Sequence, residues 1–412
     1  MLVHRTRLTA YAVYLIYSGL TSLSGSTIFV VNLVYQVEVA HLNPLQLVLV
    51  GTALELVAFI AQVPTGVLAD VYSRRLSVIT GIFLFGMAFI LEGSFPRFAI
   101  ILATQVLFGV GASLMDGAEQ AWIAGEVGDE RVGQVFLRGT QVGLLLSLLG
   151  AALGVALGSI KLNLPIIIGG VLSIVAAAFM LLFMPETNFH PAASEERHNW
   201  RELGNTFRYG IRVVRGRTIL ITILLIGLFY GLYSEGFDRL STAHILADFT
   251  LPALGQLKPV VWFGIISVAS TLLTLAASEV VRRRVDTNDQ LRVIRMLLII
   301  NAVGVIGLLI FTLAGNFYLA LAALLTFNVF RAVNEPVYTT WLTKNIDAKV
   351  RATVISMRGQ VDAFGQIAGG PPVGYIGTVF SIRAALVASS IILSPVVLLF
   401  TYASRKTKRQ VD

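Results

Sequence analysis

The sequence contains no cysteine, and its five histidines are scattered along 412 residues. Disulfide bonds, thiol catalysis and cysteine-ligated metal sites are therefore excluded. The metalloprotease pattern H-E-x-x-H and the phosphate-binding pattern G-x-x-x-x-G-K-[ST] are also absent, so the chain has no ATP-binding loop of that kind. We therefore expect no enzymatic activity, no metal site and no cofactor.

Charged residues are scarce as well. They make up 13% of the chain, against about 25% in a soluble globular protein. Hydrophobic residues reach 56%, and the mean hydropathy is +0.79. Twelve apolar segments are each long enough to cross a hydrocarbon core about 30 Å thick. They lie at 8–34, 45–68, 77–95, 98–122, 133–158, 164–184, 218–243, 259–280, 293–313, 316–341, 352–377 and 381–403. The composition indicates a protein that crosses a membrane many times.

Lysine and arginine are distributed unevenly around these segments. When residues at the segment ends are counted with the adjoining loop, 23 of the 31 such residues fall on one side, four on the other side and four deeper inside the segments. Because positive loops remain in the cytoplasm, we expect both termini of this multi-pass membrane protein to be cytoplasmic. The net charge of +8 is then a topology signal, and no nucleic acid partner is expected.

One long polar stretch, 185–217, divides the chain almost in half. We therefore predict a six-helix bundle over 1–186, a cytoplasmic linker over 187–217 and a second six-helix bundle over 218–412. Within the linker, Trp200–Val214 has apolar residues at helical spacing with arginines between them. That pattern is typical of a short amphipathic helix on the inner leaflet, and a disordered tether is the alternative.

The two halves repeat each other. In each half a tryptophan is preceded, six residues earlier, by an acidic residue and is followed by two arginines that are seven residues apart. The members are Asp116, Trp122, Arg131 and Arg138 in the first half and Glu335, Trp341, Arg351 and Arg358 in the second. Parallel repeats of this kind predict two bundles related by an axis along the membrane normal. The expected fold class is therefore an all-α membrane protein with twelve transmembrane helices in two pseudo-symmetric six-helix bundles.

Glycines recur at every fourth position in two of the spans. Span five contains Gly150, Gly154 and Gly158, and span eleven contains Gly365 and Gly369. Small residues at this spacing let two helices approach closely, so we expect tight helix crossings in both spans.

The turn between spans two and three, residues 64–76, reads PTGVLADVYSRRL. Gly66 would allow close backbone packing there, and Asp70 would end the helix. Arg74 and Arg75 would hold the turn on the cytoplasmic side. The stretch resembles the loop signature of the major facilitator superfamily, G-x-L-A-D-x-x-G-R-[KR], with a serine in place of the second glycine. A weaker echo, SEVVRRRV, follows span eight and places Glu279 where the first half has Asp70.

The resemblance implies a secondary transporter that works by alternating access, with a central cavity that opens to one side at a time. In overall style the chain looks like bacterial twelve-span drug/H+ antiporters, which use a proton gradient and no ATP. This likeness implies a location in the bacterial inner (plasma) membrane. The resemblance further implies that Asp70 contacts the start of span eleven. Arg74 would pair with an acidic group near the inner end of span four, and Glu279 would take the mirrored role against span five.

Charged residues inside the spans are the candidates for the site, because burying a charge in a bilayer is costly and such a group normally faces a cavity or a partner. The proton- or substrate-binding candidates are Glu55, Asp116, Glu119, Asp238, Arg331 and Glu335. The candidates for conformational gating are Gly66, Asp70, Arg74, Arg75, Arg138, Glu279, Arg358 and Asp362.

Several of these residues have a structural alternative. Glu55 lies near mid-bilayer, where it could carry a proton or make a structural hydrogen bond to a neighbouring helix. Asp116 and Glu119 lie one helical turn apart. They could carry a proton, or they could form a gate or a salt bridge with Arg138 or Arg358.

Two charge pairs with i, i+4 spacing are also expected: Glu235–Arg239 in span seven and Arg331–Glu335 in span ten. The group around Asp238 could form an outer gate, a site for a cationic substrate or an interfacial ion pair.

The leading hypothesis is a monomeric, proton-coupled exporter of lipophilic or cationic small molecules, with Glu55, Asp116 and Glu335 as the main carboxylates. Its partners would be the substrate, protons and the lipid bilayer. One alternative is a proton-coupled importer or facilitator of a small solute. Another is a lipid or lysolipid translocator, or a transporter-shaped receptor without net flux. The sequence leaves open the substrate, the direction of transport and the proton stoichiometry.

Overall fold

The computed structural model describes residues 8–189, 214–215, 217–284, 289–346 and 350–411. In this part of the chain the regular elements are helices and no β-strand is formed, which confirms the predicted all-α class. Eleven of the helical spans in these residues are long and apolar enough to cross a membrane. The other predicted span, 352–377, corresponds to α13 (Arg351–Val379), a 29-residue helix with more polar residues and several glycines.

The helices form two compact units. Unit 1 comprises the described residues of 1–41 and 56–200, and unit 2 those of 42–55 and 201–412. The helices of unit 1 are α1 (Ala10–Glu38), α3 (Arg74–Ser94), α4 (Phe98–Met115), α5 (Ala118–Val127), α6 (Asp129–Ile160) and α7 (Leu164–Phe183). Those of unit 2 are α9 (Thr218–Asp248), α10 (Val261–Arg284), α11 (Gln290–Leu313), α12 (Phe317–Asn345), α13, α14 (Ile382–Leu393) and α15 (Pro395–Val411).

Helix α2 (Pro44–Val71) belongs to both units, because Leu42–Glu55 packs with unit 2 and the residues from Leu56 onward pack with unit 1. The predicted division at 186 and 217 and the cytoplasmic position of the termini stay predictions. The predicted linker helix, Trp200–Val214, lies almost wholly outside the described residues.

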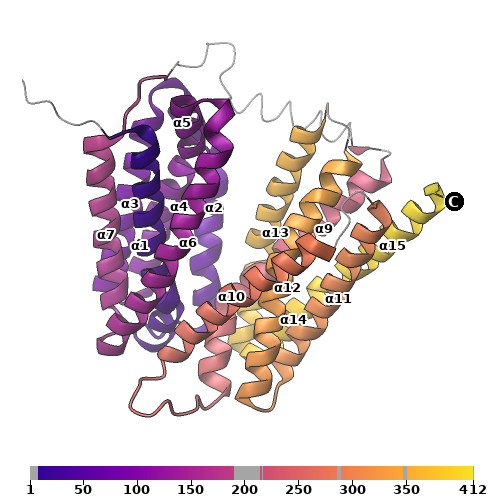
Figure 1. Ribbon diagram of the computed structural model, residues 1–412. Coiled ribbons are helices and arrows are strands. Elements are labelled where there is room, and N and C mark those ends of the chain that lie inside the picture. Colours follow the sequence, from indigo (N-terminus) through magenta and orange to yellow (C-terminus); the bar gives the residue numbers. More distant parts are fainter. Residues whose placement is uncertain (1–7, 190–213, 216, 285–288, 347–349, 412) are drawn as a thin grey trace, which may run out of the picture. The chain divides into compact units, whose positions relative to one another are not determined.

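In unit 1, α1 packs along α6 and α7, and α3 packs against α4 and α7 (Figure 1). The glycines of α6 make the first contact possible, as the sequence predicted. A Cβ atom on Gly150 or Gly154 would collide with the backbone carbonyls of Leu23 and Thr27. The indole Nε1 of Trp122 donates to the carbonyl oxygen of Pro185 at 2.6 Å and ties α5 to the end of α7.

The fourth span is interrupted, whereas the sequence predicted one continuous helix over 98–122. Helix α4 ends at Met115, Asp116 is extended, and α5 begins at Ala118 (Figure 1). Gly117 joins the two helices with φ of +74°, a backbone conformation that only glycine adopts at little cost. The interruption was missed because both flanking segments are apolar and have helical periodicity.

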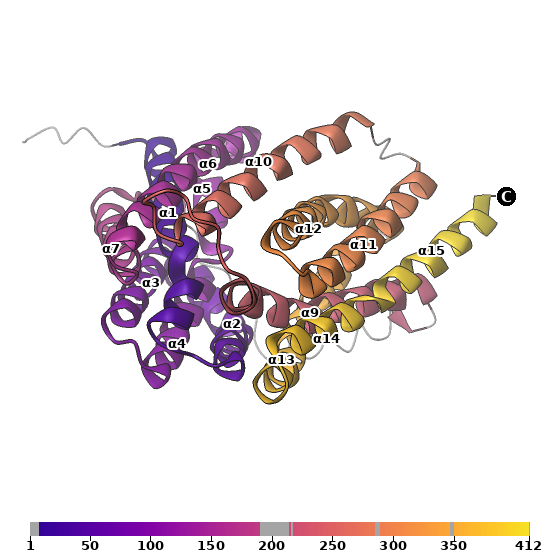
Figure 2. The ribbon, with the colours of Figure 1, turned by 90° about the horizontal axis from the view of Figure 1, so that it is seen from below.

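In unit 2, α9 packs against α13 and α14, and α11 packs against α12 and α15 (Figure 2). Gly231 of α9 faces the carbonyl of Asp362, while Gly365 and Gly369 of α13 face the backbone around Leu228 and Leu232. This confirms the tight crossing that the glycine spacing of span eleven predicted. The last span is also divided, since α14 ends at Leu393 and α15 starts at Pro395, a residue that has no N–H for a continuing helix.

Candidate functional site

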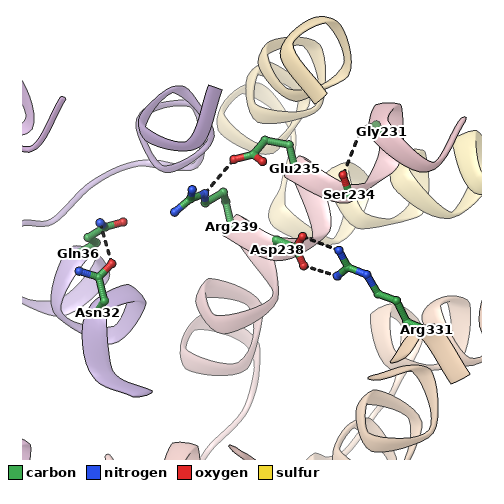
Figure 3. A network of polar contacts seen from close by, with 8 residues as sticks. All are labelled: Asn32, Gln36, Gly231, Ser234, Glu235, Asp238, Arg239 and Arg331. Atoms are coloured by element: carbon green, nitrogen blue, oxygen red, sulfur yellow. Dashed lines mark hydrogen bonds and ion pairs between the residues drawn. The ribbon is translucent and has the colours of Figure 1, made fainter. Parts of the chain in front are cut away.

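The most conspicuous charged contact of unit 2 joins α9 and α12. Both guanidinium nitrogens Nη1 and Nη2 of Arg331 donate to the carboxylate of Asp238, the second at 2.8 Å (Figure 3). The guanidinium carbon lies 5.8 Å from the ring centroids of Tyr233 and of Phe237. The side chains of Arg331 and Asp238 remain 37% and 42% exposed. The pair is therefore partly accessible and does not lie in the sealed core of the unit.

This contact replaces a predicted one. The sequence predicted that Arg331 pairs with Glu335 four residues later, and the structure shows that this is wrong. Asp238 on the neighbouring helix offers both carboxylate oxygens to the guanidinium fork, which is the stronger geometry. An arginine placed before a glutamate at i, i+4 is also the less favourable order along a helix.

Glu335 instead binds Arg358. The two Nη atoms of Arg358 on α13 donate to the two carboxylate oxygens of Glu335 on α12, at 2.9 and 3.1 Å. The guanidinium of Arg358 also lies 4.8 Å from the ring centroid of Tyr338. The expected salt bridge from Asp116 or Glu119 to Arg358 would join the two units, and it stays a prediction.

A third pair lies within α9, where Arg239 Nε donates to Glu235 Oε1 at 2.9 Å (Figure 3). This confirms the predicted i, i+4 pair. Gly51 of α2 faces it so closely that an added Cβ atom would collide with the carboxylate of Glu235 and with Nε of Arg239. Gly370 of α13 likewise leaves room for Thr52, since a Cβ atom there would lie 2.8 Å from its hydroxyl. The first half of α2 is thus fitted against α9 and α13.

Glu55 ends this part of α2 and has no hydrogen-bond partner among the described residues. The charged groups that act on it are the carboxylates of Glu235, Asp238 and Asp362 and the guanidinium of Arg239. Asp362 itself accepts a hydrogen bond from Gln366 at 3.0 Å. The environment of Glu55 therefore contains more carboxylates than guanidiniums.

Three neutral side chains form a closed ring of hydrogen bonds among α9, α11 and α12. Tyr230 donates to Asn301 Oδ1 at 2.7 Å, Asn301 Nδ2 donates to Asn334 Oδ1 at 2.9 Å, and Asn334 Nδ2 donates to the Tyr230 hydroxyl at 2.9 Å. Asn301 Nδ2 also donates to the carbonyl of Leu297 at 2.8 Å, which fixes the orientation of its amide and hence the direction of the whole ring. Sequence reasoning missed this ring, although asparagines inside apolar spans are a signal for buried hydrogen bonds.

Removing the Tyr230 hydroxyl should therefore destabilise unit 2. In Tyr230→Phe, Asn301 Oδ1 and Asn334 Nδ2 lose their partner, and unsatisfied buried groups cost about 1–3 kcal/mol. We expect a clear fall in the melting temperature of the purified protein in detergent. Tyr233→Phe on the same helix is the matched control. It keeps the aromatic side chain beside Arg331 and removes a hydroxyl that takes no part in the hydrogen bonds among Tyr230, Asn301 and Asn334. Equal melting temperatures for the two variants would contradict the prediction.

Of the two carboxylates predicted for span four, Glu119 of α5 has a side-chain hydrogen-bond partner. The Tyr17 hydroxyl of α1 donates to its Oε2 atom at 2.8 Å. Asp116 lies at the interruption before α5 and is exposed. Arg138 donates to Gln141 at 3.1 Å, so the expected salt bridge between Arg138 and either carboxylate is not the contact observed here.

Comparison with known proteins decides the family. Residues 15–369 match the sequence model of the Major Facilitator Superfamily. The chain belongs to this superfamily. It is 22% identical over 365 residues to an uncharacterized MFS-type transporter, YxaM, of Bacillus subtilis (strain 168), and the match covers 87% of each chain. The resemblance seen in the sequence is thus confirmed.

Solved structures of this superfamily share the fold. The nucleoside transporter NupG superimposes with a TM-score of 0.70 at 14% identity, covering 97% of this chain and 99% of that one. A bacterial homolog to the human lysosomal transporter Spinster gives a TM-score of 0.72 at 13% identity, covering 96% of each chain. At these identities the likeness shows the fold and leaves the substrate open.

The superfamily signature turn makes contacts that differ from those implied by the resemblance. Arg74 donates from Nη1 to the carbonyl of Ala121 at 3.0 Å, and its Nη2 lies 3.8 Å from Asp70. The acidic neighbour of Arg74 is therefore Asp70 in the same turn. In span four, Arg74 binds a backbone carbonyl and not an acidic group. Within unit 1 no close packing is found at Gly66, since a Cβ atom there would meet no atom of the described residues within 4 Å.

The turn is held by an acid that the sequence reasoning did not single out. Glu186, just after α7, accepts from the Ser73 hydroxyl at 2.7 Å and from the backbone N–H of Arg75 at 2.9 Å. The Arg75 guanidinium donates to the carbonyl of Leu181. In unit 2, Glu279 binds Arg282 and Arg283 of its own helix at 2.6–2.7 Å. The contacts implied for Asp70 with span eleven and for Glu279 with span five would join the two units, and they stay predictions.

Proposed function

We propose that this superfamily transporter is a proton-coupled antiporter that exports cationic small molecules. One observation carries the proposal, namely the balance of charges on the polar side of unit 2. Within 44–55 of α2, 230–240 of α9, 328–338 of α12 and 355–366 of α13, five carboxylates stand against three guanidiniums. The carboxylates are Glu55, Glu235, Asp238, Glu335 and Asp362, and the guanidiniums are those of Arg239, Arg331 and Arg358.

The three guanidiniums are engaged with three of the carboxylates, which leaves Glu55 and Asp362 in excess. An ionised carboxylate inside a membrane span is costly without a counter-charge, so it recruits a proton or a cation. When a proton and a cationic substrate compete for the same carboxylate, binding of one releases the other. That exchange is antiport, and Glu55 is our proton carrier because it lacks a hydrogen-bond partner among the described residues.

The remaining assignments belong to the same proposal. Asp116, Glu119, Asp238, Arg331 and Glu335 line the substrate or proton path. The two conformations are controlled by Gly66, Asp70, Arg74, Arg75, Arg138, Glu279, Arg358 and Asp362. The protein acts as a monomer in the bacterial plasma membrane with its termini in the cytoplasm.

The experiment that tests the proposal measures proton release in reconstituted vesicles that carry an imposed pH gradient. A panel of organic cations is added, and internal pH is followed by a fluorescent dye. Wild-type protein should release protons on addition of a substrate, whereas Glu55→Gln should lose at least about 90% of the signal because the amide binds no proton at these pH values. Glu130→Gln, which removes an exposed carboxylate at the start of α6, should behave as wild type.

Substrate flux without proton movement in the wild type would overturn the coupling. Full proton release from Glu55→Gln would keep antiport but remove Glu55 as its carrier.

A further inference from the structure

Unit 1 carries a groove with polar walls. It lies where α1, α5 and α6 meet and has a volume of about 360 Å³. Its polar lining consists of Tyr14, Ser18, Thr21 and Ser22 of α1, Glu119 of α5, and Thr140 and Ser147 of α6. These residues recur at helical spacing along α1 and α6, so that one polar stripe of each helix faces the groove.

Two glycines of α6 shape this groove. A Cβ atom on Gly139 would lie 3.1 Å from the hydroxyl oxygen of Tyr14, and one on Gly143 would lie 2.8 Å from that of Ser22. Both glycines line the groove themselves. The absence of side chains at these positions therefore keeps the hydroxyls of α1 within reach of a molecule bound against α6.

Three of the six hydroxyl groups that line the groove are oriented as hydrogen-bond acceptors. Thr21 donates its hydrogen to the carbonyl of Tyr17 at 2.9 Å, Thr140 donates to that of Phe136 at 2.9 Å, and Ser147 donates to that of Leu144 at 2.8 Å. Each of these hydroxyl hydrogens is thus used by the helix that carries it. What remains for a ligand is the oxygen lone pairs, because a hydroxyl has one hydrogen and two lone pairs.

Glu119 adds a carboxylate to the same wall. One of its oxygens, Oε2, accepts from Tyr17, and the other, Oε1, receives no hydrogen bond from the described residues. Asp116 is the charged group that acts on Glu119, and it has the same sign. Arg138, adjacent in sequence to Gly139, donates to Gln141. The groove therefore offers acceptors and negative charge.

Resting on the antiport function proposed above, we infer that this groove binds the cationic head of the substrate and that this head carries N–H donors. The substrate class is then a primary or secondary ammonium or a guanidinium compound. A quaternary ammonium has the charge but no N–H group. It would attract the carboxylate of Glu119 but could donate no hydrogen bond to the hydroxyl oxygens. Hydrogen bonds that involve a charged group are the stronger ones, which makes the N–H donors decisive for selection.

The test compares three probes of the same ring and charge: benzylammonium, benzylguanidinium and benzyltrimethylammonium. Binding to the purified full chain in detergent is measured by isothermal titration calorimetry. The two probes with N–H groups should bind at least about tenfold more tightly than the quaternary one. Glu119→Gln should weaken the benzylammonium complex about tenfold and change the quaternary complex much less, while its amide oxygen can still accept from Tyr17.

Two further variants separate a local effect from a general one. Thr140→Val removes one acceptor at nearly constant shape and should weaken benzylammonium binding a few-fold, about two to five times. Glu38→Gln removes an exposed carboxylate at the other end of α1 and should leave all three affinities unchanged. Melting temperatures of the variants confirm that each is folded.

Equal affinities for the ammonium and quaternary probes would overturn the inference, and so would an unaltered affinity in Glu119→Gln or a lack of binding by all three probes. None of these results depends on proton movement, which the vesicle experiment with Glu55→Gln measures separately. A chain that releases protons but binds the quaternary probe equally well would retain the antiport proposal and lose this one.

Discussion

A Gly231→Leu variant is expected to lose about 3 kcal/mol of stability, because α9 and α13 touch through their backbones at this position. An added Cβ atom would collide with the carbonyl oxygen of Asp362 and would lie 3.0 Å from the backbone nitrogen of Gln366. Neither obstacle is the flexible end of a side chain, so the two helices must separate. We expect a melting temperature far below that of the wild type and a loss of transport.

Gly359→Ala is the matched control for this prediction. It lies on α13 in an exposed position, where a Cβ atom would meet nothing within 4 Å of the described residues. Alanine is the better helix former by about 0.5–1 kcal/mol, so this variant should melt at or above the wild-type temperature. If Gly231→Leu had the same melting temperature as Gly359→Ala, the close crossing of α9 and α13 would be contradicted.

Reversing one charge of the Asp238–Arg331 pair should abolish transport, and reversing both should restore a large part of it. In Asp238→Arg, two guanidiniums would face each other between α9 and α12, and in Arg331→Asp two carboxylates would do so. Breaking a buried pair costs about 3–5 kcal/mol. Because both side chains are partly exposed, we expect about 2 kcal/mol for each single variant.

The double variant Asp238→Arg/Arg331→Asp recreates the ion pair in the opposite direction. Its melting temperature should return to within a few degrees of the wild-type value, about 1 kcal/mol or less. Transport by the vesicle assay is the second readout. A double variant that is as unstable as the singles would show that the two residues do not depend on each other.

The helices were predictable from sequence because eleven of the described spans are strongly apolar. The twelve predicted segments correspond to the observed spans with changes at their ends. Interruptions were not predictable in the same way. Gly117 is one glycine among 37, and its φ of +74° follows from the packing of α4 and α5 on their neighbours. Nothing in an apolar periodicity distinguishes such a glycine from one inside a continuous helix.

For the candidate site, the sequence likewise predicts which residues are involved but not which residues they pair with. Charge inside an apolar span identifies Asp238, Arg331 and Glu335 as functional candidates, and all three make inter-helix ion pairs. Their partners could not be derived, because pairing between helices depends on how each helix is rotated and how deep it lies. Local spacing gave Glu235–Arg239 correctly, since both residues lie on one helix, and failed for Arg331–Glu335, where a better acceptor comes from α9.

The shared helix α2 means that a cut in the polar linker would not separate the two units cleanly. The first half-chain would carry away Leu42–Glu55, a segment that belongs to unit 2. The second half-chain would then expose the backbone around Gly370 and Gly374, which Val48 now covers, and would leave the Thr378 hydroxyl without the N–H of Leu45. A fragment beginning in the linker is thus one segment short of a complete unit, and two co-expressed half-chains could complete it only by donating that segment across the cut.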